Sequence, residues 1–163
     1  MELSIIIVSY NTRDTTIACL SSIVKSKVTF EYEVVVVDNN SLDGSVSAIK
    51  KHFPTVTLIS NTSNLGFSAA NNIGINRSTG VYKLLLNSDT ILLDHTLERL
   101  HEFAVSSKEK IVAPKLLNQD FTIQRSWFNF PTPLKTFLRF TDIYLLFYRL
   151  ADSWFLRLIS KFY

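Results

Sequence analysis

The chain has 163 residues, of which 47% are hydrophobic and 19% are charged. This length and composition are typical of one globular domain with a substantial core, and they exclude an intrinsically disordered chain. The formal net charge of +3 is too small to favour nucleic acid as a partner. A single cysteine, Cys19, excludes an internal disulfide framework and favours a reducing compartment, and its helical apolar surroundings predict a buried position.

Strand-like and helix-like segments alternate from the N-terminus. Helices are expected to end near residues 27, 52 and 76, and Asp94 is expected to cap a fourth. This alternation predicts an α/β fold with a mostly parallel sheet, flanked by helices that make right-handed crossovers. The strand at 81–86 is expected to be buried. Runs of strand type lie at residues 3–9, 33–37, 56–59, 81–86 and 110–113.

Polar residues follow the first four expected strands, at Tyr10, Asp38, residues 61–64 and residues 87–89. The carboxyl ends of parallel strands meet at one edge of a sheet, where ligands bind. A carboxylate there can accept a hydrogen bond from a pyrimidine ring N–H, and another can hold a divalent cation that bridges a diphosphate. Position alone leaves Asp38 and Asp89 equally open to roles as helix caps or turn residues. The sequence contains no glycine-rich phosphate loop, which disfavours a dinucleotide-binding protein or a P-loop protein.

The composition changes after residue 120, so we predict two segments with different roles, residues 1–120 and residues 121–163. The second part is rich in aromatic residues, and from residue 133 its charged residues fall on about half of a helical wheel. Two interpretations stay open for this amphipathic helix: contact with a membrane surface, or packing against the rest of a domain. No uncharged apolar run approaches the roughly 20 residues that a membrane-spanning helix requires. The N-terminus also lacks a positive leader, so a cytoplasmic protein is expected.

Four blocks of sequence carry a resemblance to a known family. They lie at residues 4–11, 35–45, 64–74 and 84–90. Together, in this order and spacing, they resemble the family 2 glycosyltransferases, and the likeness is greatest to the bacterial rhamnosyltransferase-like branch. The resemblance covers residues 3–120. It implies a GT-A fold with a Rossmann-like sheet, a nucleotide-sugar donor, and inversion at the anomeric carbon.

The resemblance also assigns residues to the donor. Val8 and Tyr10 would flank the base, Asp38 would bind its ring N–H, and Asn64 and Gly66 would lie near the donor. A dTDP- or UDP-sugar would fit this branch.

Asn87-Ser88-Asp89 stands where the family has its D-x-D motif. Asp89 would therefore be the ligand for Mg²⁺ or Mn²⁺. Asn87 can still bond a ribose hydroxyl but supplies no charge, so metal affinity would be weaker or the metal less essential. The implied pathway is the synthesis of bacterial cell-surface polysaccharide. The acceptor would be a glycan or a lipid-linked molecule at the inner face of the membrane, with peripheral membrane contact through residues 133–163.

A general base for the acceptor hydroxyl is not assigned by the sequence. Family members continue well past residue 163 and carry this acid in the continuation. Only Asp142 and Asp152 follow Asp120 here, and neither lies in a family motif. The catalytic residue is therefore unknown, and two hypotheses follow. One is the donor-binding half of a glycosyltransferase; the other is an inactive truncated relic or a partner-binding module.

Overall fold

The computed structural model describes residues 1–126 and 132. The chain divides into two units, the first at Met1–Pro114 and the second from Lys115 onward. The amphipathic helix expected from residue 133 lies outside the described residues. The functional division at residue 120 stays a prediction.

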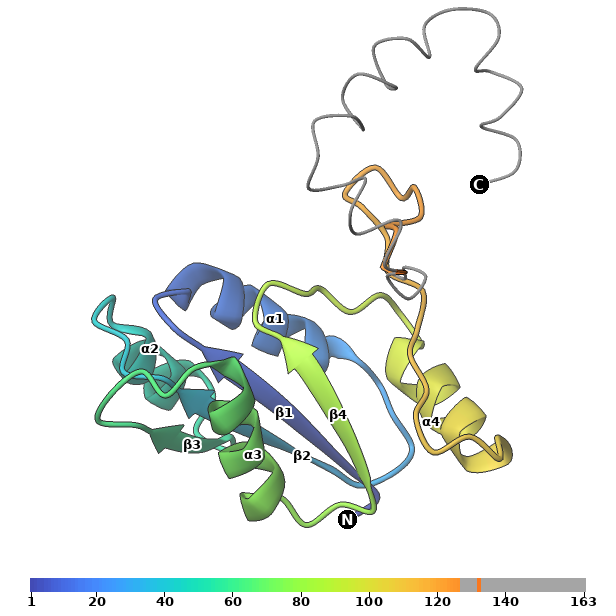
Figure 1. Cartoon of the computed structure of the whole chain (residues 1–163), viewed down its shortest axis with the longest axis horizontal. Helices are drawn as coiled ribbons and strands as arrows, with labels where there is room; N and C mark the ends of the chain where they lie inside the picture. Colours follow the sequence, from blue (N-terminus) through green and yellow to red (C-terminus); the bar gives the residue numbers. More distant parts are fainter. Residues whose placement is uncertain (127–131, 133–163) are drawn as a thin grey trace, which may run out of the picture. The chain divides into compact units, whose positions relative to one another are not determined.

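The first unit alternates strands and helices, as the sequence predicts. All pairings between its strands are parallel, and the described sheet has the order β3-β2-β1-β4. The predicted α/β fold with a parallel sheet is therefore confirmed. The elements are β1 (Leu3–Ser9), α1 (Arg13–Lys25), β2 (Tyr32–Asp38), α2 (Ser45–His52), β3 (Thr57–Ser60), α3 (Phe67–Arg77), β4 (Tyr82–Asn87) and α4 (Thr96–Ser106) (Figure 1).

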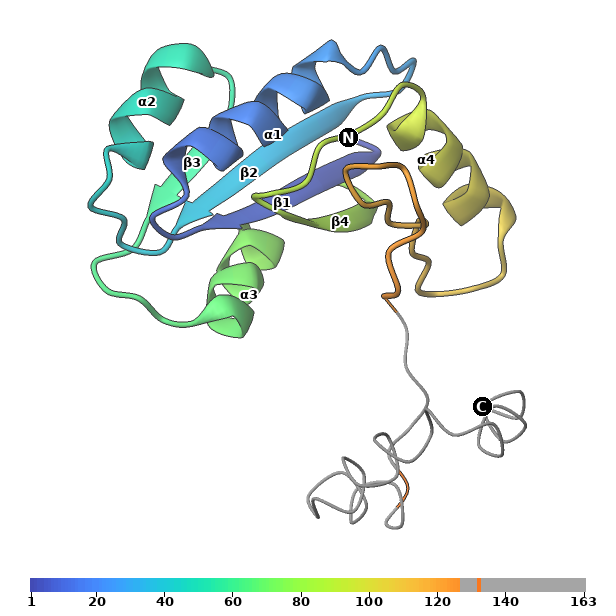
Figure 2. The same ribbon diagram turned by 90° about the horizontal axis from the view of Figure 1, so that it is seen from above.

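Helices cover both faces of this sheet because its two central strands are apolar on both sides. Ile5 and Ile7 of β1 pack in a core with side chains of α1, α2 and α4. Ile6 packs on the opposite face with Ala70 of α3. Figure 2 shows α1 and α2 above the sheet and α3 below it. Gly74 lets α3 pack close to β1, because a side chain at this position would place its Cβ only 2.5 Å from Ile6 Cγ2.

Strand β4 is only half buried, so the expectation of a buried strand is wrong. Tyr82, Leu84 and Leu86 pack against the α1 side of the sheet, whereas Leu85 on the other face is 50% exposed. The reason is the position of β4 at the edge of the described sheet. α3 packs on β1 and β2 and does not extend over β4.

Two further expectations about the end of the first unit are wrong. Residues 110–113 form no strand in the described structure, and Ile111 is 89% exposed, because this segment pairs with no described strand. The N-cap of α4 is His95 rather than Asp94, and His95 has a left-handed φ of 61°.

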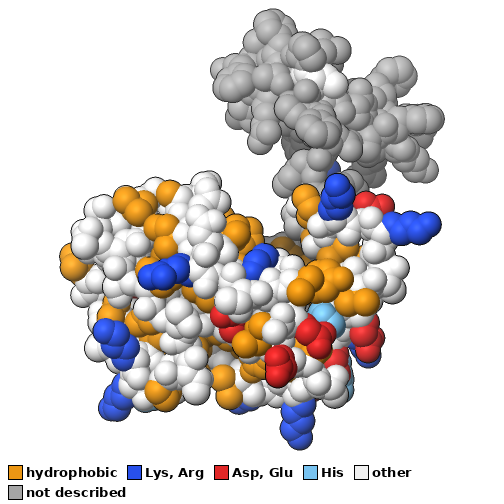
Figure 3. Space-filling view, turned by 90° about the horizontal axis from the view of Figure 1, so that it is seen from below, with side chains coloured by type: hydrophobic (Ala, Val, Ile, Leu, Met, Phe, Trp, Pro, Cys, Tyr) orange, Lys and Arg blue, Asp and Glu red, His pale blue; other side chains and the backbone are white. Residues whose placement is uncertain are grey.

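At the amino ends of the strands, Glu33 ties three segments together. Its Oε1 accepts hydrogen bonds from Ser4 Oγ at 2.7 Å, Thr79 Oγ1 at 2.9 Å and the Gly80 amide at 3.3 Å. The Thr79 amide donates to the same oxygen. Burial alone would raise the pKa of Glu33, but these hydrogen bonds outweigh it and lower the pKa to about 2. Viewed from the side of the N-terminus, acidic side chains gather beside a histidine (Figure 3).

The described part of the second unit contains one short antiparallel turn. Leu117 and Ile123 form a bridge, and the Gln124 amide donates to the Leu116 carbonyl at 2.8 Å. Asp120 Oδ1 accepts from the amide and the hydroxyl of Thr122. Within residues 1–126 and 132, no helix is both long enough and apolar enough to span a bilayer.

Candidate functional site

The carboxyl ends of the strands meet at one edge, as the sequence predicts. Ser9 is in register with Asp38, Asp38 with Ser60, and Val8 with Asn87. β1 is the point where the chain reverses its direction of travel across the sheet, because β2 and β3 lie to one side of it and β4 to the other. Open α/β sheets bind ligands outside the carboxyl ends of their strands at such a switch point.

Asp38 is a buried acid with one unsatisfied oxygen. Its side chain is 1% exposed, and Oδ2 accepts a hydrogen bond from the Ser41 amide at 2.9 Å. Oδ1 is also buried and has no hydrogen-bond partner within the described part of the chain. A buried acceptor left without a donor costs about 1–3 kcal/mol. Asp38 Oδ1 is therefore a place where an N–H group of a ligand would restore a missing hydrogen bond.

Asn39, which the sequence analysis did not single out, organises the loop after β3. Its Nδ2 donates to Asn64 Oδ1 at 2.7 Å and, more weakly, to the Gly66 carbonyl at 3.4 Å. Its Oδ1 accepts from Asn61 Nδ2 at 3.1 Å and from the Leu65 amide at 3.0 Å. All four hydrogen-bonding positions of this buried amide are thus used inside the protein.

This amide network fixes the positions of Asn64 and Gly66, the two residues predicted to lie near the nucleotide-sugar. Asn64 Oδ1 also accepts from the Gly66 amide at 2.9 Å, so both residues are held beside Asn39. Gly66 has φ 81° and ψ 164°, a conformation available almost only to glycine. Position next to the Asp38 strand end was the one signal in the sequence that could have identified Asn39.

The loop after β1 is tied to the loop after β2. Asn11 accepts from the Leu42 amide at 2.8 Å through Oδ1, and its own amide donates to Ser41 Oγ at 2.9 Å. Asn11 and Asn40 both have left-handed backbones, with φ of 52° and 70°. Asparagine tolerates this conformation better than most residues. Tyr10 precedes Asn11 and is 48% exposed, so its ring is accessible at this edge.

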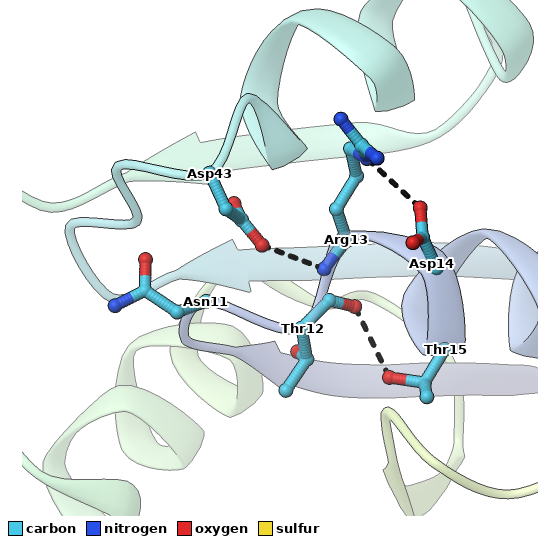
Figure 4. Close-up of a pocket in the computed structure, with 6 residues that line it drawn as sticks. All are labelled: Asn11, Thr12, Arg13, Asp14, Thr15 and Asp43. Atoms are coloured by element: carbon cyan, nitrogen blue, oxygen red, sulfur yellow. Dashed lines mark hydrogen bonds and ion pairs between the residues drawn. The ribbon is translucent and has the colours of Figure 1, made fainter.

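An open hollow of about 370 Å³ lies outside these two loops (Figure 4). Its charged groups already have partners. Arg13 Nε bonds Asp14 Oδ1 at 2.9 Å, and the Arg13 amide donates to Asp43 Oδ2 at 2.8 Å. Burial alone would raise the pKa of Asp43, but hydrogen bonds from Ser45 and the Arg13 amide lower it. Asp43 therefore places negative charge at the starts of both α1 and α2, which disfavours a phosphate in this hollow.

Asn87, Ser88 and Asp89 form a turn at the end of β4. The Thr90 amide closes it by donating to the Asn87 carbonyl at 3.2 Å. Asn87 and Asp89 are exposed, and Ser88 is half-buried. Together they offer a carboxylate, an amide oxygen and a hydroxyl.

These three oxygen ligands suit a hard cation, although only the carboxylate of Asp89 is charged. Among the described residues, no group of three or more His, Cys, Asp or Glu side chains is placed to hold a metal ion. Mg²⁺ normally keeps several waters and binds through one or two carboxylates together with phosphates of the substrate. The turn is therefore suited to a cation that arrives with a diphosphate rather than to a metal held by the protein alone.

The structure brings the predicted residues to one edge in two groups. Asp38, Asn64 and Gly66 gather around Asn39, and Val8 lies beside Asn87 in the sheet. Asn87, Ser88 and Asp89 share one turn.

Comparison with known proteins agrees with this geometry. The model of Glycosyl transferase family 2 matches residues 4–157. A poly(ribitol-phosphate) beta-glucosyltransferase of Bacillus spizizenii is 33% identical over 121 residues, which are 71% of this chain and 19% of that protein. The chain spans between 19% and 33% of the length of the curated relatives it matches.

Solved structures show the same fold. S. aureus TarS 1-349 in complex with UDP-GlcNAc is 27% identical with a TM-score of 0.58, over 64% of this chain and 31% of that one. A mannosyltransferase from Pyrobaculum calidifontis, solved with GDP-Man and Mn²⁺, is 24% identical with a TM-score of 0.59. It covers 64% of this chain and 32% of its own, and at this identity its likeness concerns the fold alone. The GT-A fold expected from the sequence is confirmed.

Proposed function

This chain belongs to the family 2 glycosyltransferases, and we propose that it binds a nucleotide-sugar donor together with Mg²⁺ or Mn²⁺. The reaction served would be the inverting transfer of the sugar to a glycan or lipid-linked acceptor. The observation that carries the proposal is the buried Oδ1 of Asp38, which has no described partner and lies at the carboxyl end of β2, next to the switch-point strand β1. A pyrimidine ring N–H is a donor of the kind that this oxygen lacks.

Position on the same edge supports the remaining proposed roles. Val8 and the exposed Tyr10 would flank the base, and Asn64 and Gly66 would lie along the donor in the loop fixed by Asn39. A UDP-sugar is supported by TarS, which was solved with UDP-GlcNAc. A dTDP-sugar offers the same ring N–H. A polymeric acceptor is supported by the relative named for poly(ribitol-phosphate). We place the reaction at the cytoplasmic face of the membrane.

Asp89 would hold the cation, assisted by the amide oxygen of Asn87. When bound, a divalent cation stabilises the negative charge of a departing nucleoside diphosphate. Direct displacement with inversion also needs a base for the acceptor hydroxyl. No residue in 1–126 or 132 is assigned that role. The second candidate function is binding without turnover, as an inactive relic or a partner-binding module.

Titration of the full chain with UDP-, dTDP- and GDP-sugars, with and without Mn²⁺, tests the proposal. We expect Asp38→Asn to weaken binding by about 10- to 100-fold, because a hydrogen bond to a charged acceptor contributes about 1.5–3 kcal/mol. Asp89→Ala should abolish the gain in affinity that Mn²⁺ provides. Asp94→Asn is the matched control, since this exposed acid lies five residues beyond Asp89 and has no assigned role. Absence of binding to every nucleotide-sugar would refute the proposed function.

A transfer assay separates the two candidates. Sugar transfer or donor hydrolysis by the chain, with liposomes present or absent, would establish an enzyme. Donor binding with neither reaction would favour the binding module.

A further inference from the structure

One buried side of α1 carries two hydroxyl side chains and a thiol. Thr16, Cys19 and Ser22 are spaced three residues apart, and with Thr12 just before the helix they line one face. Thr16 and Cys19 are 0% exposed, and Ser22 is 9% exposed. Polar side chains buried along a helix face need partners, and several of these partners lie at the end of β4 and on the segment after it.

Three side-chain contacts join this face of α1 to residues 87–92. Thr12 Oγ1 lies 3.2 Å from Ser88 Oγ. Cys19 Sγ donates to the Asn87 carbonyl at 3.7 Å. Ser22 Oγ accepts from the Leu92 amide at 3.1 Å. The turn that carries Asp89 is therefore held both before and after the acid.

Thr12 is the most constrained of these side chains. Its hydroxyl forms a triangle with Ser9 Oγ and Thr16 Oγ1, in which each pair is 3.1 Å apart. Ser88 is its third partner. A hydroxyl has one donor and two acceptor sites, so three partners use its full capacity. Because Ser9 and Thr16 are buried, the triangle is a fixed base from which Thr12 reaches the turn.

We infer that Thr12 is a positioning residue for the proposed donor site: through Ser88 it fixes the turn that presents Asp89 to the cation. The inference rests on the proposed function for its effect on metal binding, but not for its effect on the turn. Thr12 and Thr16 lie outside the four blocks of sequence that carry the family resemblance, and neither was assigned to the nucleotide-sugar. Their role would be to hold Asp89 in place before the donor and cation arrive.

The test compares Thr12→Val, which removes the hydroxyl at nearly constant shape, with Thr12→Ser, which restores it. Thr57→Val on the exposed edge of β3 is the matched control. The first measurement, which needs no ligand, is hydrogen exchange at the Thr90 amide that closes the turn. We expect Thr12→Val to speed this exchange about 3- to 10-fold, the effect of losing one hydrogen bond. Exchange in Thr12→Ser and Thr57→Val should stay as in the wild type.

The second measurement is the ratio of donor affinities in Mn²⁺ and in EDTA. Thr12→Val should reduce this ratio several-fold and leave the affinity in EDTA unchanged, and Thr12→Ser should recover the ratio. Unchanged Thr90 exchange would overturn the inference even if the wild type bound no donor, an outcome that separately defeats the proposed function. Equal losses with and without Mn²⁺ would also overturn it, since they would indicate a structural role alone.

Discussion

The two ends of the sheet use different chemistry to hold their loops. At the amino ends, the charged side chain of Glu33 accepts hydrogen bonds from Ser4, Thr79 and Gly80. At the carboxyl ends most ties are neutral: an amide network around Asn39 and a hydroxyl triangle at Thr12. Asp43 is a charged exception, because it accepts a hydrogen bond from the Arg13 amide. The other two carboxylates have spare capacity, because Asp38 Oδ1 has no described partner and Asp89 is exposed.

This difference teaches how stability and binding are separated in one sheet. At the amino ends, the charge of Glu33 is stabilised by four hydrogen bonds within the protein and contributes to folding. At the carboxyl ends, mostly neutral groups fix the loops, and Asp38 and Asp89 keep hydrogen-bonding capacity for a ligand. Changes at the amino ends should therefore alter stability without altering donor affinity, and changes at the carboxyl ends should alter affinity.

The largest effect is expected from Gly80→Ala at the amino ends. A Cβ there would lie 2.6 Å from the Ser4 amide nitrogen and 2.7 Å from the Leu3 carbonyl carbon. These are backbone atoms of a central strand and cannot move aside, so we expect a loss of about 3 kcal/mol or more of unfolding free energy. Urea denaturation measures it.

Gly74→Ala is the matched comparison for this variant. Its Cβ would also come close, at 2.5 Å, but to the Cγ2 methyl of Ile6 rather than to backbone. A side chain can adjust more readily, so the loss should be smaller. If Gly80→Ala were the milder of the two, the amino ends would be less rigid than the hydrogen bonds around Glu33 imply.

The next largest effect is a pH dependence at Glu33. Its pKa is about 2 in the folded chain against an ordinary 4.5. A lowered carboxyl pKa contributes stability above pH 4.5, and this contribution is lost as pH falls from 4.5 toward 2. The shift corresponds to at most about 3 kcal/mol, and solvent screening reduces this to about 1–2 kcal/mol.

Comparison of the wild type with Glu33→Gln isolates this contribution. The difference in unfolding free energy should be greatest at pH 7 and shrink steadily below pH 4.5. Glu102→Gln, at an exposed position of α4, should show no such trend. A constant difference across this pH range would mean that Glu33 is not held in its charged form. Donor affinity at pH 7 should be the same in both variants.

Much of this arrangement could be predicted from the sequence, because local patterns determine it. The apolar runs predicted the strands β1 and β2, and the polar strand ends predicted the edge of the sheet at which we propose that the donor binds. The exposed face of β4 could not be predicted, since a half-apolar edge strand and a buried one differ only in what covers them. The partners of Asn39 and Thr12 were also out of reach. The contact between Asn39 and Asn61 and the contact between Thr12 and Ser88 join positions 22 and 76 residues apart, which only the folded topology brings together.

The last comparison concerns backbone conformation at the carboxyl ends, where two glycines have positive φ, and it includes the smallest predicted effect. Gly44 has ψ 10°, the left-handed conformation that Asn11 and Asn40 also adopt, whereas Gly66 has ψ 164°. Gly44→Asn should therefore change stability by less than about 0.5 kcal/mol, and Gly66→Asn should cost about 1–2 kcal/mol.

A steric clash does not explain the predicted cost at Gly66, because a Cβ there would meet nothing within 4 Å. Any loss would come from the backbone itself and from strain on the amide network that Gly66 shares with Asn39. Donor titration of the same two variants completes the comparison: Gly66→Asn should bind the nucleotide-sugar several-fold more weakly, and Gly44→Asn should match the wild type. Equal behaviour of the two variants would show that the loop after β3 does not depend on this glycine. The carboxyl edge would then owe its shape to the side-chain amides alone.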